Sequence, residues 1–295
     1  MARAQHASAE RIECNDGGVT AAAHQNSDIT TVLCDLDGVV WLAHEPIAGS
    51  TDAVAALRAT GRRVLFVTNN SSARLDQHVA ALAAVGIDAT GDVISSSTAA
   101  AQLVHPGERV LVTGGPGIVE AVEGRGAIAI VNDGSIDVRT GICEPFDAVV
   151  VGLHRDFDYA RLRSAAAALH GGARLIGTNS DTTFPTPLGL DPGGGAIVAA
   201  VAAAGESTPT FAGKPHAPMA AAIGVAIGND FDPASTVMVG DRPETDGLMA
   251  IELRCRFALV RSGVTRPGEV IEAERGVRID LDVADLAGLA AVIDV

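Results

Sequence analysis

The chain has 295 residues, of which 47% are hydrophobic and only 3% aromatic, and its formal net charge is −15. This length and apolar content predict a packed protein with room for two domains, and they exclude a disordered chain. The acidic charge argues against a general nucleic-acid binder, which needs a basic face to neutralise phosphates. It is compatible with a small anionic substrate, because one local cation or metal ion can dominate the field inside a cleft.

Residues 1–27 are small and polar, without the hydrophobic stretch of a secretory signal, and we expect them to form a flexible extension. No later apolar stretch of membrane-spanning length is free of charged residues, glycine or proline. The cysteines form no C-x-x-C pair, which is typical of a reducing compartment (Cys14, Cys34, Cys143 and Cys255). We therefore expect a cytoplasmic protein without a membrane partner.

Short runs rich in Val, Leu and Ile recur along the rest of the chain and end in polar or glycine clusters. Nearly continuous apolar runs are typical of strands buried on both faces of a parallel sheet. Such strands are predicted at 31–36, 63–68, 109–113, 147–152, 174–178, 209–213, 235–240 and 256–260. Ala-rich amphipathic segments predict helices between them, at 52–60, 73–85, 159–170, 195–204 and 218–227. This alternation predicts a doubly wound α/β fold with right-handed crossovers.

Polar side chains follow several of these strands at the point where each strand ends. Asp35 and Asp37 follow the first run, Thr68 closes the second, and Lys214 and Asp241 follow the runs at 209–213 and 235–240. In an open parallel sheet, ligands bind beyond the carboxyl ends of the strands. We therefore expect these side chains to gather at one edge of one sheet.

The acidic residues of this edge suit a metal site. If the strand before Asp241 neighbours the first strand, Asp241 approaches Asp35 and Asp37, and such a gathering of carboxylates is unfavourable without a cation. Oxygen ligands with room for water and a phosphate favour Mg²⁺. The structural alternative makes Asp35 and Asp37 solvated turn residues and Asp246 a first-turn acid of a helix.

Two further elements suit a phosphate. Lys214 lies between a glycine and a proline and can point its ammonium at a phosphoryl oxygen, although most lone lysines are surface residues. The segment 68–72 offers hydroxyl, amide and backbone donors before a helix, although it also fits an ordinary cap and turn. The joint occurrence of all these elements at strand ends favours one shared catalytic site.

These residues resemble the haloacid dehalogenase (HAD) superfamily of phosphatases, and more narrowly its NagD / p-nitrophenyl-phosphatase-like branch. The similarity runs from about Thr31 to Val264. Sequence motifs typical of this branch occur at 66–71, 147–152, 177–181, 189–193, 212–215 and 239–242. The resemblance implies a Rossmann-like parallel-sheet core with a large inserted α/β cap. It places the core at residues 28–96 and 208–295 and the cap at 97–207.

The resemblance also implies a reaction, the magnesium-dependent hydrolysis of small phosphate monoesters. In it Asp35 attacks phosphorus and forms an aspartyl-phosphate. Asp37 protonates the leaving oxygen and then activates the hydrolytic water. Mg²⁺ is held by the side chains of Asp35 and Asp241 and by the main-chain carbonyl of Asp37, while Asp246 supports these ligands. Phosphoglycolate, glycerol phosphate, sugar phosphates and nucleotides all stay open as substrates, with p-nitrophenyl phosphate as an in vitro substrate.

Further residues are implied to hold the substrate. Thr68 and Lys214 bind the transferring phosphoryl oxygens, and the backbone around Asn69 and Asn70 lines the phosphate pocket. In the cap, the expected contacts with the leaving group centre on Asp181 and Phe184. Members of this branch often dimerise through the cap, so the expected partners are a small phosphorylated metabolite and a second copy of the chain.

Some neighbouring residues are open to two interpretations. Trp41 follows the first motif in a loop that we expect to face the cap and contact substrate, with a smaller role for His44. Cys34 should point away from the site by strand alternation, and His216 fits a surface residue at a helix start. The glycine-rich segment 114–117 lacks the P-loop pattern, so we interpret it as a strand-to-helix turn in the cap.

Two rival functions use similar residues. A phosphoaspartate signalling receiver also has acids and a lysine at strand ends, but receivers are much shorter, lack a cap-sized insertion and do not carry the D-x-D-G pattern. A catalytically silent protein that binds phosphorylated metabolites is the second rival. It is disfavoured because every motif residue of the phosphatases is present.

Overall fold

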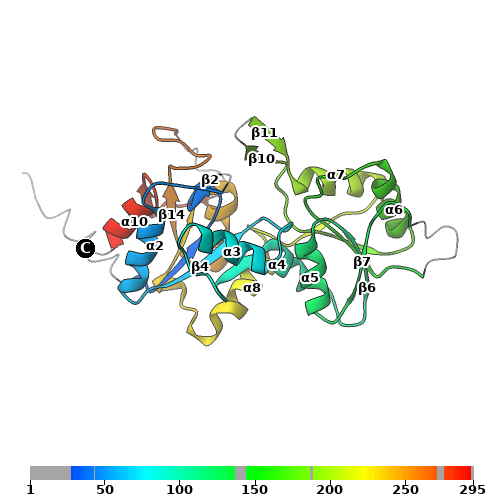
Figure 1. The fold of residues 1–295 in the computed structure, drawn as a ribbon, viewed down its shortest axis with the longest axis horizontal. Coiled ribbons are helices and arrows are strands. Elements are labelled where there is room, and N and C mark those ends of the chain that lie inside the picture. Colours follow the sequence, from blue (N-terminus) through cyan, green and yellow to red (C-terminus); the bar gives the residue numbers. More distant parts are fainter. Residues whose placement is uncertain (1–27, 43, 137–143, 187–188, 271–275, 294–295) are drawn as a thin grey trace, which may run out of the picture.

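The computed structural model describes residues 28–42, 44–136, 144–186, 189–270 and 276–293, so the predicted extension at 1–27 lies outside the described residues. The described chain forms two lobes side by side, each built around its own parallel sheet (Figure 1). This arrangement agrees with the predicted doubly wound α/β class.

The first lobe holds a six-stranded sheet in the order β15-β14-β13-β1-β4-β5, in which every neighbouring pair is parallel. Its strands are β1 (Thr31–Cys34), β4 (Arg63–Thr68), β5 (Val93–Ser95), β13 (Thr236–Gly240), β14 (Arg256–Val260) and β15 (Leu281–Val283). The central strand β1 is paired along its whole length with β13. Asp35 and Asp241, which follow these two strands, are therefore neighbours at one edge of the sheet.

Alternating side chains of the central strands fill the two faces of this sheet. Val32 and Cys34 pack on one face with helices α2 (Ser50–Ala59) and α10 (Leu286–Ile293). Leu33 and Met238 point to the other face, which is covered by α4 (Ser96–Ala101), α8 (Ala217–Ile227) and α9 (Leu248–Leu253). Because both faces are buried, these strands are nearly all apolar, as the sequence indicates. Helix α3 (Leu75–Ala84) follows β4 and also belongs to this lobe, and the short helix η4 (Pro243–Gly247) follows β13 and contains Asp246.

The second lobe holds a five-stranded parallel sheet in the order β12-β9-β8-β6-β7. Its strands are β6 (Arg109–Thr113), β7 (Ile128–Val131), β8 (Ala148–Val151), β9 (Arg174–Gly177) and β12 (Thr210–Phe211). One face packs on α6 (Tyr159–His170) and α7 (Gly194–Ala204), with Val149 and Val198 in the shared core. Helix α5 (Pro116–Gly124) contributes Ile118 to the apolar cluster on the other face.

A continuous apolar cluster joins the two lobes. It contains Leu33 and Leu65 of the first sheet together with Val110 and Val150 of the second. In Figure 1, α4 and α5 lie between the two lobes. We propose that the chain is divided into a catalytic core of residues 28–96 and 208–295 and an inserted cap of residues 97–207. The two separate sheets support this division in outline. Its boundaries differ from those of the lobes by a few residues, because α4 covers the first sheet and β12 belongs to the second.

Strand β12 departs from the expected organisation. The run at 209–213 was expected to end at the same sheet edge as Asp35 and Asp241, but β12 pairs with β9 of the second sheet. Lys214 therefore reaches the first lobe from a strand of the second lobe. A two-residue strand shows too little pattern to reveal its partner, which is why the sequence placed it in the wrong sheet.

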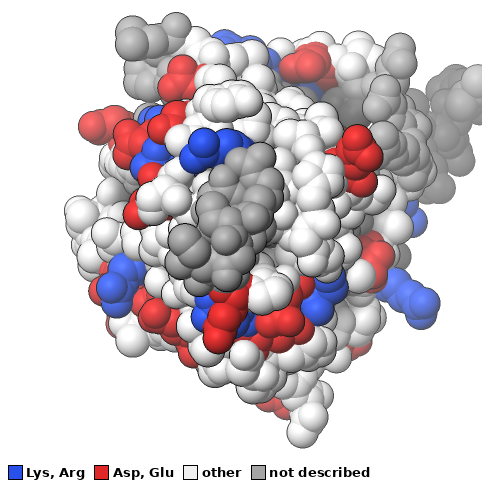
Figure 2. All heavy atoms as spheres, turned by 90° about the vertical axis from the view of Figure 1, so that its right-hand side faces the viewer, with Lys and Arg blue, Asp and Glu red and all other residues white. Residues whose placement is uncertain are grey.

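Two short antiparallel hairpins complete the described fold. They are β2 (Trp41–Leu42) with β3 (Glu45–Pro46), and β10 (Thr183–Thr186) with β11 (Gly189–Pro192). Within the described residues, no helix combines the length and the apolar character needed to cross a membrane. Figure 2 shows acidic and basic side chains interspersed among uncharged residues on the outer end of the second lobe.

Candidate functional site

Three buried carboxylates meet at the carboxyl edge of the first sheet. Asp35 follows β1, while Asp241 and Asp246 follow β13, and each offers an oxygen within 4.8 Å of the others. Asp246 is fully buried, Asp241 is 2% exposed and Asp35 is 9% exposed. The expected proximity of Asp35 and Asp241 is therefore present in the structure, and Asp246 lies within the same cluster.

Lys214 supplies the positive charge of this cluster. Its ammonium lies 2.8 Å from Oδ1 of Asp35 and 2.7 Å from Oδ1 of Asp246. Lys214 is the only lysine of the sequence, and it is 1% exposed. The surface-residue alternative for Lys214 is therefore wrong, and the side chain is fixed between two carboxylates at the centre of the cluster.

The charges in the cluster do not balance without a cation. Three carboxylates face one ammonium, so the fully ionised cluster carries two excess negative charges. Burial raises the pKa of Asp35 well above its ordinary value, and the neighbouring carboxylates add to this effect against the opposing effect of Lys214. Burial likewise raises the pKa of Asp241 to about 6, helped by Asp246. A divalent cation would restore the balance.

Asp241 presents one oxygen that fits such a cation. Its Oδ2 accepts a hydrogen bond of 2.6 Å from the backbone N–H of Val264. Its Oδ1 is buried and has no hydrogen-bond partner among the described residues. A buried carboxylate oxygen without a donor is costly, and a metal ion held by oxygen ligands would satisfy it.

The turn that holds Asp241 was not identified from the sequence. Thr265 donates from Oγ1 to the main-chain carbonyl of Asp241 at 2.5 Å, and Ser262 donates to the carbonyl of Gly38 at 2.7 Å. The segment 262–265 follows β14 at the same sheet edge, so the strand-end argument applied to the run at 256–260 could have found it.

Asp37 lies beside the buried cluster, with an exposed side chain. Its Oδ1 accepts a hydrogen bond of 3.1 Å from the indole N–H of Trp41. Trp41 itself is 2% exposed and belongs to the core cluster of the first lobe. The expectation that Trp41 contacts substrate therefore gives way to a different role, since its ring is buried and its N–H orients Asp37.

The turn after β4 is tied to the Lys214 turn. Thr68 is buried, and its Oγ1 accepts a hydrogen bond of 3.0 Å from the N–H of Asn70. Asn69 bonds the Lys214 backbone on both sides: its Oδ1 accepts from the N–H at 2.8 Å, and its Nδ2 donates to the carbonyl at 3.2 Å. The structure thus brings together the two elements predicted to hold a phosphate.

The two residues predicted to contact the leaving group lie in different settings. Asp181 is half-buried, accepts a hydrogen bond of 3.1 Å from Asn69, and has a pKa raised by burial. Phe184 is half-buried on β10, with the guanidinium of Arg155 stacked 5.6 Å from its ring centre. Asp181 therefore joins the two lobes in this structure, whereas Phe184 contacts Arg155 of its own lobe.

The secondary candidates lie outside the cluster. Cys34 is buried in the core, as strand alternation predicts, and burial raises the pKa of its thiol. His216 stacks on Phe211 with ring centres 5.5 Å apart, and His44 tilts against Trp41 at 5.2 Å. The glycines at 114–117 precede and begin α5, in agreement with a strand-to-helix turn.

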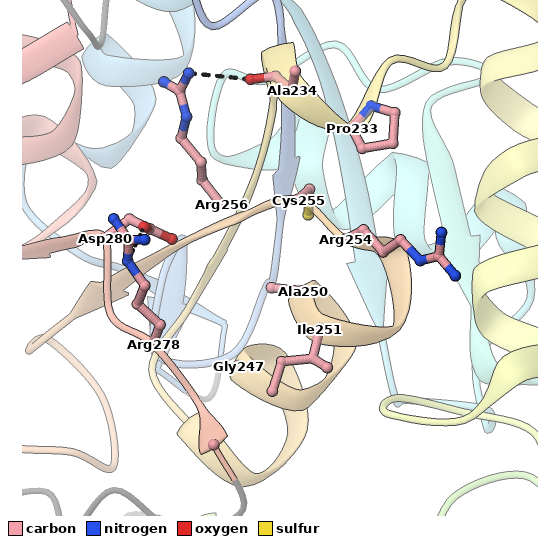
Figure 3. A pocket seen from close by; sticks show the side chains of 11 residues that line it. Pro233, Ala234, Gly247, Ala250, Ile251, Arg254, Cys255, Arg256, Arg278 and Asp280 are labelled. Atoms are coloured by element: carbon pink, nitrogen blue, oxygen red, sulfur yellow. Dashed lines mark hydrogen bonds and ion pairs between the residues drawn. The ribbon is translucent and has the colours of Figure 1, made fainter.

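A separate cavity of about 390 Å³ lies at the opposite edge of the first sheet (Figure 3). Ala234 just before β13 and Arg256 at the start of β14 line it, and Arg256 donates to the carbonyl of Ala234. Because these residues mark the amino ends of strands, this cavity is distinct from the carboxylate cluster at the carboxyl ends.

Two family models match the chain. Residues 32–128 match a model described as haloacid dehalogenase-like hydrolase. Residues 211–289 match a second model described as HAD-hydrolase-like. The two matched segments contain the strands that carry Asp35, Thr68 and Asp241.

Individual relatives match across both lobes. The D-glycerol 3-phosphate phosphatase of Mycobacterium tuberculosis is 37% identical over 248 residues, which are 82% of this chain and 66% of that relative. The acid sugar phosphatase of Staphylococcus saprophyticus is 32% identical over 81% of this chain and 88% of its own length. The crystal structure of a Mycobacterium tuberculosis glycerol phosphate phosphatase in complex with magnesium has a TM-score of 0.78 and 32% identity, covering 91% of this chain and 77% of the other.

Proposed function

Because this chain belongs to the haloacid dehalogenase-like hydrolases, in their NagD-like branch, we propose that it is a magnesium-dependent phosphatase acting on small phosphate monoesters. The observation that carries the proposal is the buried cluster of Asp35, Asp241 and Asp246 around Lys214, with its two excess negative charges. A cluster of this kind needs a divalent cation, and a phosphate ester is the substrate that uses both the cation and the lysine.

Mg²⁺ fits the oxygens that this site offers. Asp35 and the unpartnered Oδ1 of Asp241 would hold it, together with the main-chain carbonyl of Asp37. Asp246 supports them by fixing Lys214. When bound, the ion offsets the charge of the substrate phosphate and of the carboxylates around it.

Asp35 is the proposed nucleophile. Its Oδ1 accepts hydrogen bonds from the N–H of Leu36 at 2.8 Å and from Lys214 at 2.8 Å, so we assign the attack to Oδ2. A bond forms between Oδ2 and phosphorus while the bond from phosphorus to the ester oxygen breaks. Lys214 stabilises the Asp35 carboxylate before attack and binds a phosphoryl oxygen during transfer.

Asp37 is the proposed acid and base. Its carboxyl group gives a proton to the departing ester oxygen and later removes one from the water that hydrolyses the aspartyl-phosphate. The second step releases inorganic phosphate and restores Asp35. The hydrogen bond from Trp41 supports this role, because it limits the rotation of an otherwise exposed side chain.

The phosphoryl group is held from the turn after β4. Thr68 and Lys214 bind its oxygens, and the backbone around Asn69 and Asn70 lines the pocket. The mutual hydrogen bonds of Asn69 and Lys214 support a shared role, since they fix the two turns relative to each other.

The substrate is proposed at the level of its class. The relatives named for glycerol phosphate and acid sugars favour a small polyol or sugar phosphate over a macromolecular substrate. Asp181 and Phe184 are proposed as cap residues near the leaving group. We also propose a cytoplasmic location, no nucleic-acid partner and a homodimer formed through the cap.

Magnesium-dependent release of phosphate from p-nitrophenyl phosphate tests the proposal. The wild-type protein should turn over with Mg²⁺ and stop when EDTA is added, and Asp35→Asn should be inactive while keeping its circular dichroism spectrum. A folded wild-type protein that binds Mg²⁺ and phosphate without turnover would instead identify the silent binding protein. Transfer from a phosphodonor without release of phosphate would identify a receiver.

A further inference from the structure

The turn at 68–72 is internally linked by hydrogen bonds. Oγ1 of Thr68 accepts from the N–H of Asn70 at 3.0 Å. Oδ1 of Asn70 in turn accepts from the N–H of Ser72 at 3.0 Å and from the hydroxyl of Ser72 at 2.8 Å. A displacement at Ser72 is therefore transmitted through two side chains to Thr68, which is proposed to hold the phosphoryl group.

The second lobe holds this turn on one side through its backbone. The N–H of Gly117, in the first turn of α5, donates to the carbonyl of Ser72 at 3.1 Å. The packing is so close that a Cβ atom at Gly117 would overlap the carbonyl of Ala73. The glycine-rich segment at 114–117 is thus explained by contact with the first lobe.

Thr178, which follows β9 of the second lobe, contacts the turn at 68–72 through a buried hydrogen bond. Its Oγ1 forms a hydrogen bond of 2.9 Å with the hydroxyl of Ser71, and both residues are almost completely buried. Gly152 lies against this pair, because a Cβ atom there would come within 2.5 Å of the Ser71 hydroxyl. Removing the Thr178 hydroxyl without loss of volume would take this partner away from the buried hydroxyl of Ser71.

The segment at 178–179 also bonds the backbone of both phosphate turns. The carbonyl of Thr178 accepts a hydrogen bond of 2.7 Å from the N–H of Gly213, the residue before Lys214. Nδ2 of Asn179 donates to the carbonyl of Asn69 at 2.8 Å. Two consecutive residues of the second lobe therefore contact both turns that are proposed to bind phosphoryl oxygens.

We propose that Thr178 and Asn179 are positioning residues for the phosphate pocket, so that the second lobe holds the Thr68 and Lys214 turns in their binding geometry. The proposal rests on the proposed function for the assignment of those turns to phosphate. It gives the cap a role beyond covering the substrate, because its docking and phosphate binding become energetically coupled. The apolar cluster shared by both lobes makes this support rigid.

Calorimetric titration with inorganic phosphate in saturating Mg²⁺ tests this inference without requiring turnover. Thr178→Val keeps the volume and removes the hydroxyl, and Asn179→Asp removes the amide donor. One lost buried hydrogen bond is expected to weaken phosphate binding about fivefold to tenfold. Thr178→Ser should restore it, and all these variants should bind Mg²⁺ like the wild type, because its proposed ligands lie outside the two turns.

Thr113→Val is the matched control. Thr113 is a fully buried threonine of the same lobe whose hydroxyl accepts from Asn132 at 2.9 Å and so bonds a residue of its own lobe instead of a phosphate turn. Thr113→Val should lower the midpoint of thermal unfolding as Thr178→Val does, yet leave the affinity for phosphate unchanged. Equal phosphate affinity in Thr178→Val and wild type, or equal losses in the two valine variants, would overturn the inference. Absence of phosphate binding by the wild type would overturn it too, whereas binding without hydrolysis would contradict only the proposed function.

Discussion

At the scale of single residues, the charge of Lys214 depends on its partners, because the side chain is buried and its ammonium contacts two buried carboxylates. Burial alone would lower its pKa, but the carboxylates of Asp246 and Asp35 outweigh this effect and raise it. The ammonium therefore stays charged at all working pH values. Removing the ammonium would leave the neighbouring carboxylates buried without a counter-charge. Removing only one partner of a buried ion pair is strongly destabilising for this reason.

Lys214→Met should therefore destabilise the metal-free protein by about 3 kcal/mol or more at pH 8. The loss should shrink at pH 5, because Asp35, whose pKa is raised by burial, can then take up a proton. Urea unfolding in EDTA at the two pH values measures this, with the exposed Arg163→Met as a control for loss of one positive charge. A loss of equal size at both pH values would argue against the buried-charge explanation.

Asp241 gives the site a dependence on pH. Its pKa rises from 3.8 to about 6 in the metal-free fold, so its contribution to folding is fully present below 3.8 and is lost as the pH rises through 6. Mg²⁺ binds the ionised carboxylate, so its affinity should increase from pH 5 to pH 7. Calorimetric titration with Mg²⁺ at pH 5, 6 and 7 tests this. An affinity that does not change over this range would contradict it, and Asp241→Asn should bind too weakly to measure.

At the scale of elements, the loop after β1 and the turn at 262–265 form one packed unit around Asp241. Gly38 has a φ of 86°, and a Cβ atom there would overlap the Asp241 carboxylate. Ser262 and Val264 then fix the carbonyl of Gly38 and the Oδ2 of Asp241. The backbone of two separate loops thus determines where the free Oδ1 points.

Gly38→Ala should lower both stability and Mg²⁺ affinity. Gly61 is the matched control, because its φ is 84° and a Cβ atom there meets nothing within 4 Å. Both variants should lose roughly 1 kcal/mol of stability for the left-handed backbone, but only Gly38→Ala should bind Mg²⁺ more weakly. Unchanged Mg²⁺ affinity in a folded Gly38→Ala would show that the carboxylate can move aside.

The elements also show what the sequence could predict. The apolar runs before Asp35, Thr68 and Asp241 predicted strands of one sheet, because burial on both faces leaves a clear pattern. The sheet that contains β12 was not predictable, since its two residues reveal a strand but not its partner. The contact between Thr178 and Ser71 also escaped, because a buried hydroxyl in a polar segment looks like any turn residue. Trp41 was misplaced for a related reason, as its burial depends on tertiary packing.

At the scale of the whole molecule, two lobes with separate sheets share one apolar cluster and meet at a charged site (Figure 1). The net charge of −15 adds a general attraction for cations. If Mg²⁺ binds the folded state and not the unfolded state, it must raise the free energy of unfolding by mass action.

Thermal unfolding should therefore shift upward with Mg²⁺. The linkage predicts about 2.7 kcal/mol at a free concentration one hundred times the dissociation constant. EDTA should reverse the shift, and Asp241→Asn should abolish it, while an equal concentration of NaCl serves as the control for ionic strength. An equal shift in Asp241→Asn would mean that the stabilising ions bind elsewhere.

The aspartyl-phosphate on Asp35 can be detected by acid quenching during turnover of p-nitrophenyl phosphate, reduction with borohydride, and peptide mass spectrometry. Borohydride converts an acyl phosphate of aspartate into homoserine, so the modified residue is read from its peptide. We predict homoserine at position 35 in a Mg²⁺-dependent manner and none in Asp35→Asn. Turnover accompanied by modification at another aspartate, or by none at all, would contradict the role assigned to Asp35.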